Sequence, residues 1–296
     1  SKNGVSISED NELLDEVVAI TEYPKALLGS FESEFLQIPS EVIISSMRDN
    51  QRYFGVFKGE KLTNHFIVVA NAVCENYAQI INGNERVLRA RLKDAMFFWQ
   101  NDLKSGLQPE KLAGVLYLEG LGTLKDKAER EKVAAKALCE LYQNAEFSDI
   151  SQAIHYAKAD LLTSMVYEFT ELQGIMGSYY AKAQGFSDKI SLAIREQYLP
   201  KAENGALPSI VALANKLDTL MGLFSVNKIP SGTKDPYALR RAANGVIKIA
   251  LNLGVKFNLR ELLNKLAPNY KKFDLQSLEN FIFERLDTLY NANSSF

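Results

Sequence analysis

The sequence is poor in the residues that build metal sites and disulfide frameworks. Among its 296 residues only Cys74 and Cys139 are cysteine, and only His65 and His155 are histidine. The two cysteines lie 65 positions apart and neither belongs to a C-x-x-C pair, which argues against a zinc ribbon or a disulfide scaffold. A reducing, cytoplasmic location is therefore expected.

Long apolar runs are also missing. The longest are short, such as Phe66 to Ala70, whereas a membrane helix needs about 18 or more apolar residues. The first segment is acidic and has no initiator Met, so it does not resemble an export signal. We expect no membrane partner, and we expect the chain to be a piece of a longer protein.

No sign of charge dominates the chain as a whole. It has 34 basic and 36 acidic side chains, and its 47% hydrophobic and 24% charged residues are ordinary for about two folded domains. The charge is unevenly placed, however. Residues 1–40 contain two basic and eight acidic side chains, whereas residues 228–248 contain five basic side chains and Asp235 alone. Any contact with nucleic acid must come from such a local basic patch.

Residue patterns predict a mostly α fold with a smaller α+β part at the N-terminus. Within residues 41–74, β-branched and aromatic residues cluster as EVIISSM, RYFGVF and HFIVVANAV, which favours strands. The last two clusters flank residues 58–61, where we expect a hairpin loop. Beyond Asn84 apolar residues recur at helical spacing, and the tail from Asn258 predicts two more helices.

Three apolar stripes place helices in the second part of the chain. Each has a period of three or four residues, and the stripes are Leu88, Leu92, Ala95 or Met96, and Trp99; Ile150, Ile154, Ala157, Leu161 and Met165; and Ile210, Leu213 or Ala214, Leu217 and Met221. A further helix is predicted in SGTKDPYALRRAANGVIKIAL, with Asp235 as its N-cap and Pro236 in its first turn.

No catalytic motif is complete. Neither the segment that begins at Gly120 nor the one at Gly232 has the spacing of a phosphate-binding P-loop, so both glycines favour loop or cap positions. His65 falls in a strand-like run, and His155 lies five residues from Asp160, an offset that does not place the pair on one helix face. We therefore expect no catalytic residue and no metal site.

Basic side chains are the better candidates for binding. Arg86, Arg89 and Lys93 lie at offsets of three and four and form a positive stripe, which phosphates could contact, although a solvated helix face has the same pattern. Lys234, Arg240 and Arg241 lie in the second basic segment. Since Arg240 and Arg241 are adjacent, at most one of them is expected to share a ligand with Lys234.

Several strings resemble a known family. They are EYPKALLGSF, FLQIPSEVIISSMRDNQRYFGVF, NGNERVLRARLKDAMFFWQND, LGTLKDKAER, KADLLTSMVYEFTELQGIMGSYYA, EQYLP, ANKLDTLMGLF and SGTKDPYALRRAANGVIKI. In order, from about Glu22 to Val255, they resemble the beta subunit of the bacterial two-subunit glycyl-tRNA synthetase. The resemblance implies that residues 1–80 end an N-terminal α+β module, residues 81–255 form a helical HD-like domain and residues 256–296 are a helical extension.

The resemblance also implies a function. The chain would be a non-catalytic part of glycine–tRNA ligase that contributes to binding glycine tRNA, not DNA, and to subunit assembly. The alpha subunit would be its partner and would hold the active site with ATP and Mg, so no cofactor is expected on this chain.

The HD resemblance is degenerate. HD phosphohydrolases hold a metal with a His, an adjacent His-Asp pair and a distant Asp, and the matching positions here are Lys127, Ala159 with Asp160, and Asn215. Only Asp160 survives, and an Asp is usual in the family at the place of Asn215. One carboxylate beside a lysine cation cannot hold a metal ion, so Asp160 and Asp218 are interpreted as structural, with Lys127 able to pair with Asp160.

Two alternatives to the tRNA-binding function stay open. The chain could be an HD-type metal-dependent nucleotide phosphohydrolase, or a module that only binds the other subunit.

Overall fold

The computed structural model describes residues 4–74, 76–142, 145–200, 204–254, 256 and 258–293. By their contacts these residues form two compact units. Unit 1 comprises residues 1–104 with 167–172, and unit 2 comprises residues 105–166 with 173–296. The domain boundaries expected at residues 80 and 255 remain predictions, since compactness alone does not define the domains of a family.

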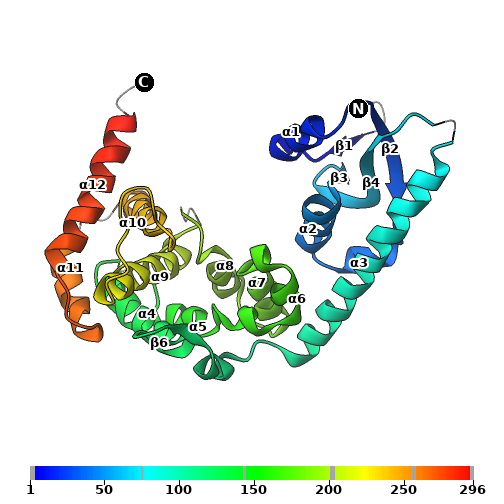
Figure 1. Ribbon diagram of the computed structural model, residues 1–296. Coiled ribbons are helices and arrows are strands. Elements are labelled where there is room, and N and C mark those ends of the chain that lie inside the picture. Colours follow the sequence, from blue (N-terminus) through cyan, green and yellow to red (C-terminus); the bar gives the residue numbers. More distant parts are fainter. Residues whose placement is uncertain are drawn as a thin grey trace. The chain divides into compact units, whose positions relative to one another are not determined.

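Unit 1 is built on a small antiparallel sheet with helices beside it (Figure 1). Its strands pair in the order β1-β3-β4-β2. Its elements are β1 (Val5–Ile7), α1 (Asn11–Ala19), β2 (Pro24–Ser30), η1 (Ser33–Gln37), α2 (Ser40–Gln51), β3 (Phe54–Lys58), β4 (Lys61–Asn71), α3 (Ala78–Ser105) and the short η4 (Thr170–Leu172).

The hairpin predicted at residues 58–61 is confirmed. Lys58 pairs with Lys61 across the turn between β3 and β4. On the other side of β4, Gly29 of β2 faces Phe66, and a Cβ at Gly29 would collide with the Phe66 ring. Phe66 also stacks on Tyr53 with ring centroids 4.7 Å apart, so an aromatic pair fills the core of this unit.

The strand predicted for EVIISSM is wrong, because these residues belong to helix α2. Val42, Ile43, Ser46 and Met47 are buried, and their offsets of one, four and five place them on one helix face. The Ser46 hydroxyl also donates to the Val42 carbonyl 2.8 Å away, so this buried hydroxyl finds its hydrogen-bond acceptor within the helix. Burial on a helix face outweighs the strand preference of the β-branched residues.

Unit 2 is almost entirely helical. Its elements are η2 (Pro109–Gly114), β5 (Leu116–Leu118), β6 (Gly122–Thr123), α4 (Leu124–Cys139), α5 (Phe147–Tyr156), η3 (Ala159–Leu162), α7 (Ile175–Ala183), α8 (Asp188–Glu196), α9 (Ala206–Ser225), α10 (Leu239–Leu253), α11 (Leu259–Leu266), η5 (Ala267–Asn269) and α12 (Leu275–Asn293). Helix α6 (Ser164–Glu168) falls where the two units are divided.

Helix α9 is the centre of unit 2 and packs against α4, α8 and α10. All four residues of its predicted stripe are buried, which confirms that stripe. Among the described helices it alone is long and apolar enough to cross a membrane, but 89% of that window is buried inside the protein. It is therefore a core helix. The stripe from Ile150 to Met165 is not one helix, because α5 ends at Tyr156 and the chain continues through η3.

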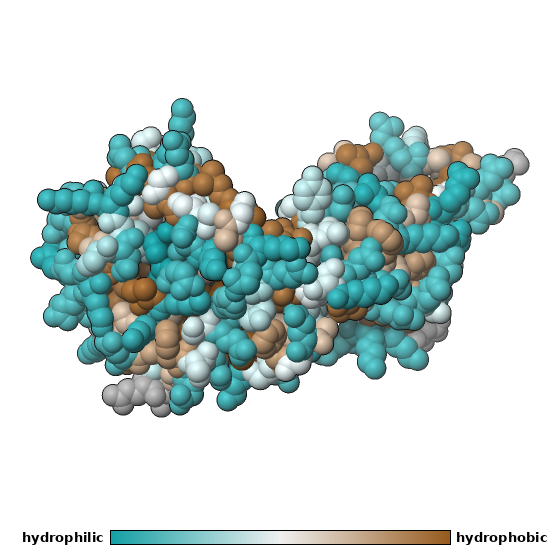
Figure 2. All heavy atoms as spheres, turned by 90° about the horizontal axis from the view of Figure 1, so that it is seen from below, coloured by the Kyte–Doolittle hydropathy of each residue, from teal (hydrophilic) through white to brown (hydrophobic). Residues whose placement is uncertain are grey.

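Hydrophilic side chains cover most of the face drawn in Figure 2, with smaller apolar patches between them. The buried residues are mainly apolar. Buried charged side chains are the exception. Several of them cluster in unit 2, among them Lys127 and Asp160, two of the positions at which the resemblance implies a degenerate HD motif.

Candidate functional site

The charged side chains of α4 point into the core of unit 2 instead of into solvent. The turn before α4 fixes where the helix begins, because the Thr123 hydroxyl accepts from the Asp126 amide and the Asp126 carboxylate accepts from the Thr123 amide. With that start, Lys127 and Glu131 share the face that packs on α9 and are only 4% and 0% exposed.

Lys127 occupies the first of the HD-like positions and is held by acids. Its Nζ lies 2.8 Å from Asp218 Oδ2, 3.1 Å from Glu131 Oε1 and 3.2 Å from Thr219 Oγ1. Burial lowers the pKa of Lys127, but the charges of Asp218 and Glu131 outweigh that effect and leave the pKa raised. Lys127 is therefore a fixed cation.

Asp218 on α9 is the most heavily bonded acid of this network. Besides Lys127, it accepts from Arg130 Nε at 2.7 Å and from the Tyr270 hydroxyl at 2.9 Å. Burial raises the pKa of Asp218, while Lys127 and Arg130 lower it by more. The interpretation of Asp218 as a structural ion-pair residue agrees with these contacts.

Lys158 joins the network through the other carboxylate oxygen of Glu131. Its Nζ lies 2.7 Å from Glu131 Oε2 and 3.2 Å from Gln197 Oε1. Burial lowers the pKa of Lys158, Glu131 opposes that shift, and the charge of Lys127 adds to it. Sequence reasoning missed Arg130, Glu131 and Lys158, although the i, i+4 spacing of Lys127 and Glu131 was a signal for a pair.

Asp160 stands apart from Lys127, so the pairing suggested for these two residues is wrong. Its Oδ2 accepts from the amides of Gly174 at 2.6 Å and Gly177 at 3.1 Å, and its Oδ1 has no hydrogen-bond partner among the described residues. Burial raises the pKa of Asp160 to about 6, against the two amide bonds and the charge of Lys158. Asp160 thus organises the turn before α7.

Asn215, the last HD-like position, donates from Nδ2 to the Gln197 carbonyl at 3.2 Å. Ala159 is fully buried and carries no polar side chain. Within the described ranges, no three His, Cys, Asp or Glu side chains are grouped so that they could hold a metal ion. The first position expected from the HD resemblance holds Lys127, whose protonated amine would repel a cation.

The first set of basic candidates lies on α3 in unit 1. Arg86 and Arg89 line an open hollow of about 420 Å³ together with Glu85, whereas Lys93 is not among its lining residues. Glu85 accepts from the Ser30 amide at 2.7 Å and from the Ser30 hydroxyl at 3.0 Å. Arg89 is paired with Glu32, which leaves Arg86 as the available cation of this hollow.

The second set lies at the start of α10 in unit 2. Helix α10 begins at Leu239, three residues after the expected first turn at Pro236, and Ala238 precedes it in the left-handed region at φ 54°. The N-cap predicted at Asp235 is therefore wrong, because Ala238 holds that position. Asp235 still satisfies the first two amides of the helix, since its carboxylate oxygens accept from Leu239 at 2.8 Å and from Arg240 at 2.9 Å.

The two arginines there behave differently. The Arg240 guanidinium donates to the Gly232 carbonyl and so folds back on the loop that carries Lys234, whereas Arg241 is exposed. The structure therefore brings Arg240 and Lys234 to one loop and places Arg241 elsewhere on the helix surface.

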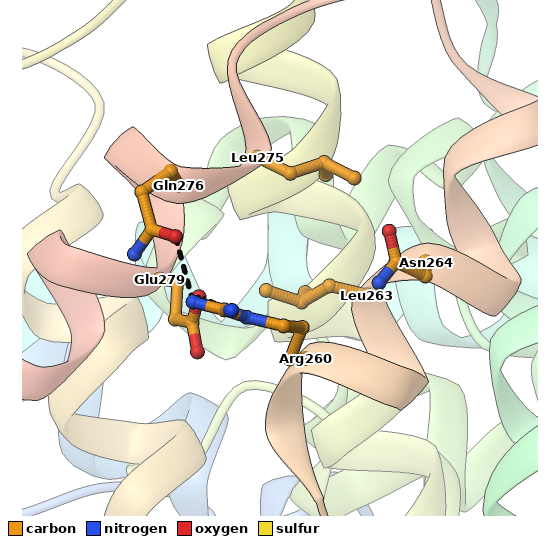
Figure 3. Close-up of a pocket in the computed structure, with 6 residues that line it drawn as sticks. All are labelled: Arg260, Leu263, Asn264, Leu275, Gln276 and Glu279. Atoms are coloured by element: carbon orange, nitrogen blue, oxygen red, sulfur yellow. Dashed lines mark hydrogen bonds and ion pairs between the residues drawn. The ribbon is translucent and has the colours of Figure 1, made fainter.

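A small pocket of about 220 Å³ between α11 and α12 was not predicted (Figure 3). Arg260 crosses it and donates to Glu279 at 2.7 and 2.9 Å and to Gln276 at 2.6 Å. Since its guanidinium is already paired with a carboxylate, Arg260 holds the two helices together and leaves no free charge for a ligand.

Comparison with known proteins gives one consistent result. The family model described as the glycyl-tRNA synthetase beta subunit matches residues 1–295. Glycine–tRNA ligase beta subunits of Helicobacter pylori (strain Shi470), Streptococcus gordonii and Bacillus subtilis are 48%, 46% and 41% identical, over 100%, 94% and 99% of this chain. The chain spans 45%, 42% and 44% of those relatives, less than half of their length.

Proposed function

We propose that this chain, which belongs to the glycyl-tRNA synthetase beta subunit family, serves in an enzyme that attaches glycine to its tRNA. The observation that carries the proposal is the match of the family across residues 1–295, together with identities above 40% to relatives named glycine–tRNA ligase beta subunit. The cytoplasm, where tRNA is charged, is the location that fits this role.

The chain's part in that enzyme is non-catalytic. The positions that match an HD metal site hold Lys127 and Asn215, and Lys127 is bonded to Asp218 and Glu131. This supports a helical HD-like domain whose former metal site has become a structural ion network. ATP, Mg and glycine then belong to the alpha subunit, which is the proposed partner.

Contact with tRNA is assigned to the two basic sets. On α3, Arg86 and Arg89 line an open hollow and Lys93 lies one turn further along the helix. Lys234, Arg240 and Arg241 add positive charge at the start of α10. Such cations bind phosphates without reading the base sequence, so they would position the tRNA and leave its identity to other contacts.

Separate binding experiments test the two proposed roles. The full-length protein is titrated with glycine tRNA and, independently, with purified alpha subunit. Binding to both supports the proposal, whereas binding to the alpha subunit alone favours a module that only assembles the enzyme.

The phosphohydrolase alternative has its own test. The purified protein is assayed for bound transition metal and for release of phosphate from nucleotides in added manganese. We expect neither a stoichiometric metal nor turnover. Turnover that is lost in Asp160→Ala would support the HD-type enzyme and contradict the proposed function.

A further inference from the structure

Helix α3 has two sides of different character. Leu88, Leu92 and Ala95 are fully buried and form the side that packs within unit 1. Since an α-helix turns by about 100° per residue, Phe97 projects about 180° away from the mean direction of these three side chains. Its ring is 62% exposed, so it contributes little to the core. Phe97 therefore presents an aromatic ring on the outer surface of α3.

Cations flank this ring along the helix. Four exposed residues of α3 lie at successive offsets of seven, four and seven, which places them in one line on its surface. We call them the α3 stripe: Arg86, Lys93, Phe97 and Lys104. With a rise of about 1.5 Å per residue, Lys93 lies about 6 Å before Phe97 along the helix axis and Lys104 about 10 Å after it. At the near end, Arg86 also lines the open hollow, so the stripe continues that hollow.

The acids of α3 lie off this stripe. Glu85 accepts from the amide and the hydroxyl of Ser30, and Asp102 is only 6% exposed. Asp94 is exposed, but it projects to the side, about 60° from Phe97 around the helix. The α3 stripe therefore presents three cations and a ring to solvent, with one acid at its border.

An exposed ring between cations fits a nucleic acid strand with unpaired bases. Lysine and arginine side chains contact phosphates, and an aromatic ring stacks on a base whose face is free. In a duplex each base is already stacked on its neighbours, so a helical stem offers Phe97 no such face. A protein partner fits less well, because the centre of a protein interface is poor in charge, whereas the α3 stripe has one large apolar side chain among three cations.

We propose that the α3 stripe binds an unpaired segment of RNA, with Phe97 stacked on a base and with Lys93 and Lys104 on phosphates at either side of it. Arg86 extends the contact into the hollow. This inference rests on the proposed binding of tRNA and makes it more specific, since it assigns α3 to the unpaired ends or loops of tRNA instead of its helical stems. It requires no reading of base identity, because every base has a face that can stack.

Binding of labelled RNA to the full-length protein tests the stripe. The probes are glycine tRNA, a short single-stranded RNA and the same strand annealed to its complement. Phe97→Ala should weaken the binding of the single strand about tenfold, the effect expected when one base loses its aromatic partner, and should leave the binding of the duplex unchanged. Phe97→Leu, which keeps an apolar side chain without a ring, should be equally weak, and Phe97→Tyr should bind like the wild type.

A matched control and the dependence on salt separate stacking from charge and from general damage. Val87→Ala removes an apolar side chain of α3 that is 43% exposed and lies off the stripe, so it should leave the affinity unchanged. Lys104→Ala should reduce the slope of log K against log salt by about 0.7, the value for one phosphate of a single strand. Phe97→Ala should lower K and keep the slope of the wild type.

The outcomes distinguish this inference from the function on which it rests. Equal affinity of the wild type and Phe97→Ala for the single strand, while glycine tRNA still binds the wild type, would overturn the stacking role and leave the proposed function standing. No binding of glycine tRNA to the wild type would contradict the proposed function and the inference with it. Weaker binding of the alpha subunit to Phe97→Ala, with RNA affinity unchanged, would show that the stripe is a protein contact and would also overturn the inference.

Discussion

Single charged side chains account for the ion network in the core of unit 2. Lys127 places a positive charge beside Asp218 and Glu131, the kind of charge that a metal ion would otherwise bring. Buried ion pairs of this kind gain little over apolar packing, but removing one partner leaves the others uncompensated. The network should therefore be sensitive to any single substitution.

The substitution Lys127→Met should lower the free energy of unfolding by about 3–5 kcal/mol, because Asp218 and Glu131 remain buried with less positive charge nearby. Lys132→Met is the matched control on α4. Its pair with Glu129 lies at the surface, where the Glu129 side chain is 56% exposed, and such pairs contribute about 0–1 kcal/mol. Calorimetric melting compares the two variants. Equal losses in both would mean that the Lys127 network does not stabilise the fold.

The raised pKa of Asp160 predicts that the free energy of unfolding depends on pH in a specific way. Its pKa in the folded protein is about 6, whereas an unfolded aspartate titrates near 3.9, so the folded state binds the proton more tightly. The stabilising contribution of this proton is complete below the unfolded pKa and is lost as the pH rises through 6.

The difference in Tm between the wild type and Asp160→Asn should therefore become less favourable to the wild type as the pH rises from 4 to 7. The asparagine keeps an oxygen that can accept from Gly174 and Gly177 but does not titrate. Asp287→Asn, an exposed position on α12, serves as the control and should show no such trend. A difference that does not change with pH would show that Asp160 titrates normally.

Among the helices, α10 has its first amides bonded by an acidic side chain that lies before the helix in sequence. Asp235 lies four residues before Leu239, yet its carboxylate accepts from the first two amides of the helix. Asp235→Ala should cost about 0.5–2 kcal/mol of stability, with no direct effect on catalysis. Melting of this variant beside Asp287→Ala, which removes an acid at an exposed position, measures the cost. An unchanged Tm would mean that other acceptors replace the cap.

Local sequence patterns correctly predicted those elements in which the apolar residues that recur periodically are also the residues that are buried. The β3-β4 hairpin, α9 and the stripe of α3 were read from the sequence because each buries the face that its own spacing defines. Helix α2 was missed because β-branched residues prefer strands, while its burial on a helix face depends on contacts elsewhere in unit 1.

The contacts of the site were harder to predict than its elements. Lys127 and Asp218 are 91 residues apart in sequence, and Asp160 reaches the amides of Gly174 and Gly177 through a turn. Sequence spacing within one helix cannot identify such partners. It therefore suggested Asp160 as the partner of Lys127, whereas the packing of α4 on α9 selects Asp218.

In the whole molecule the two basic sets belong to different units, so the contributions to RNA binding that we propose for them can be tested separately. Arg86→Ala should weaken the binding of glycine tRNA to the full-length protein and reduce the slope of log K against log salt by about 1. Arg89→Ala should have a smaller effect because Arg89 is paired with Glu32. Lys58→Ala, an exposed lysine on β3 of the same unit, is the control. Unchanged affinity in Arg86→Ala would contradict the assignment of the α3 hollow.

We propose that this chain serves in glycine–tRNA ligase without a catalytic centre of its own. The most direct measurement is the rate of glycyl-tRNA formation by the full-length protein alone, by the alpha subunit alone and by the two mixed. We expect the mixture to charge tRNA with glycine and the full-length protein alone not to do so. Charging by that protein alone, or charging by the alpha subunit at the same rate without it, would show that the proposed non-catalytic role is wrong.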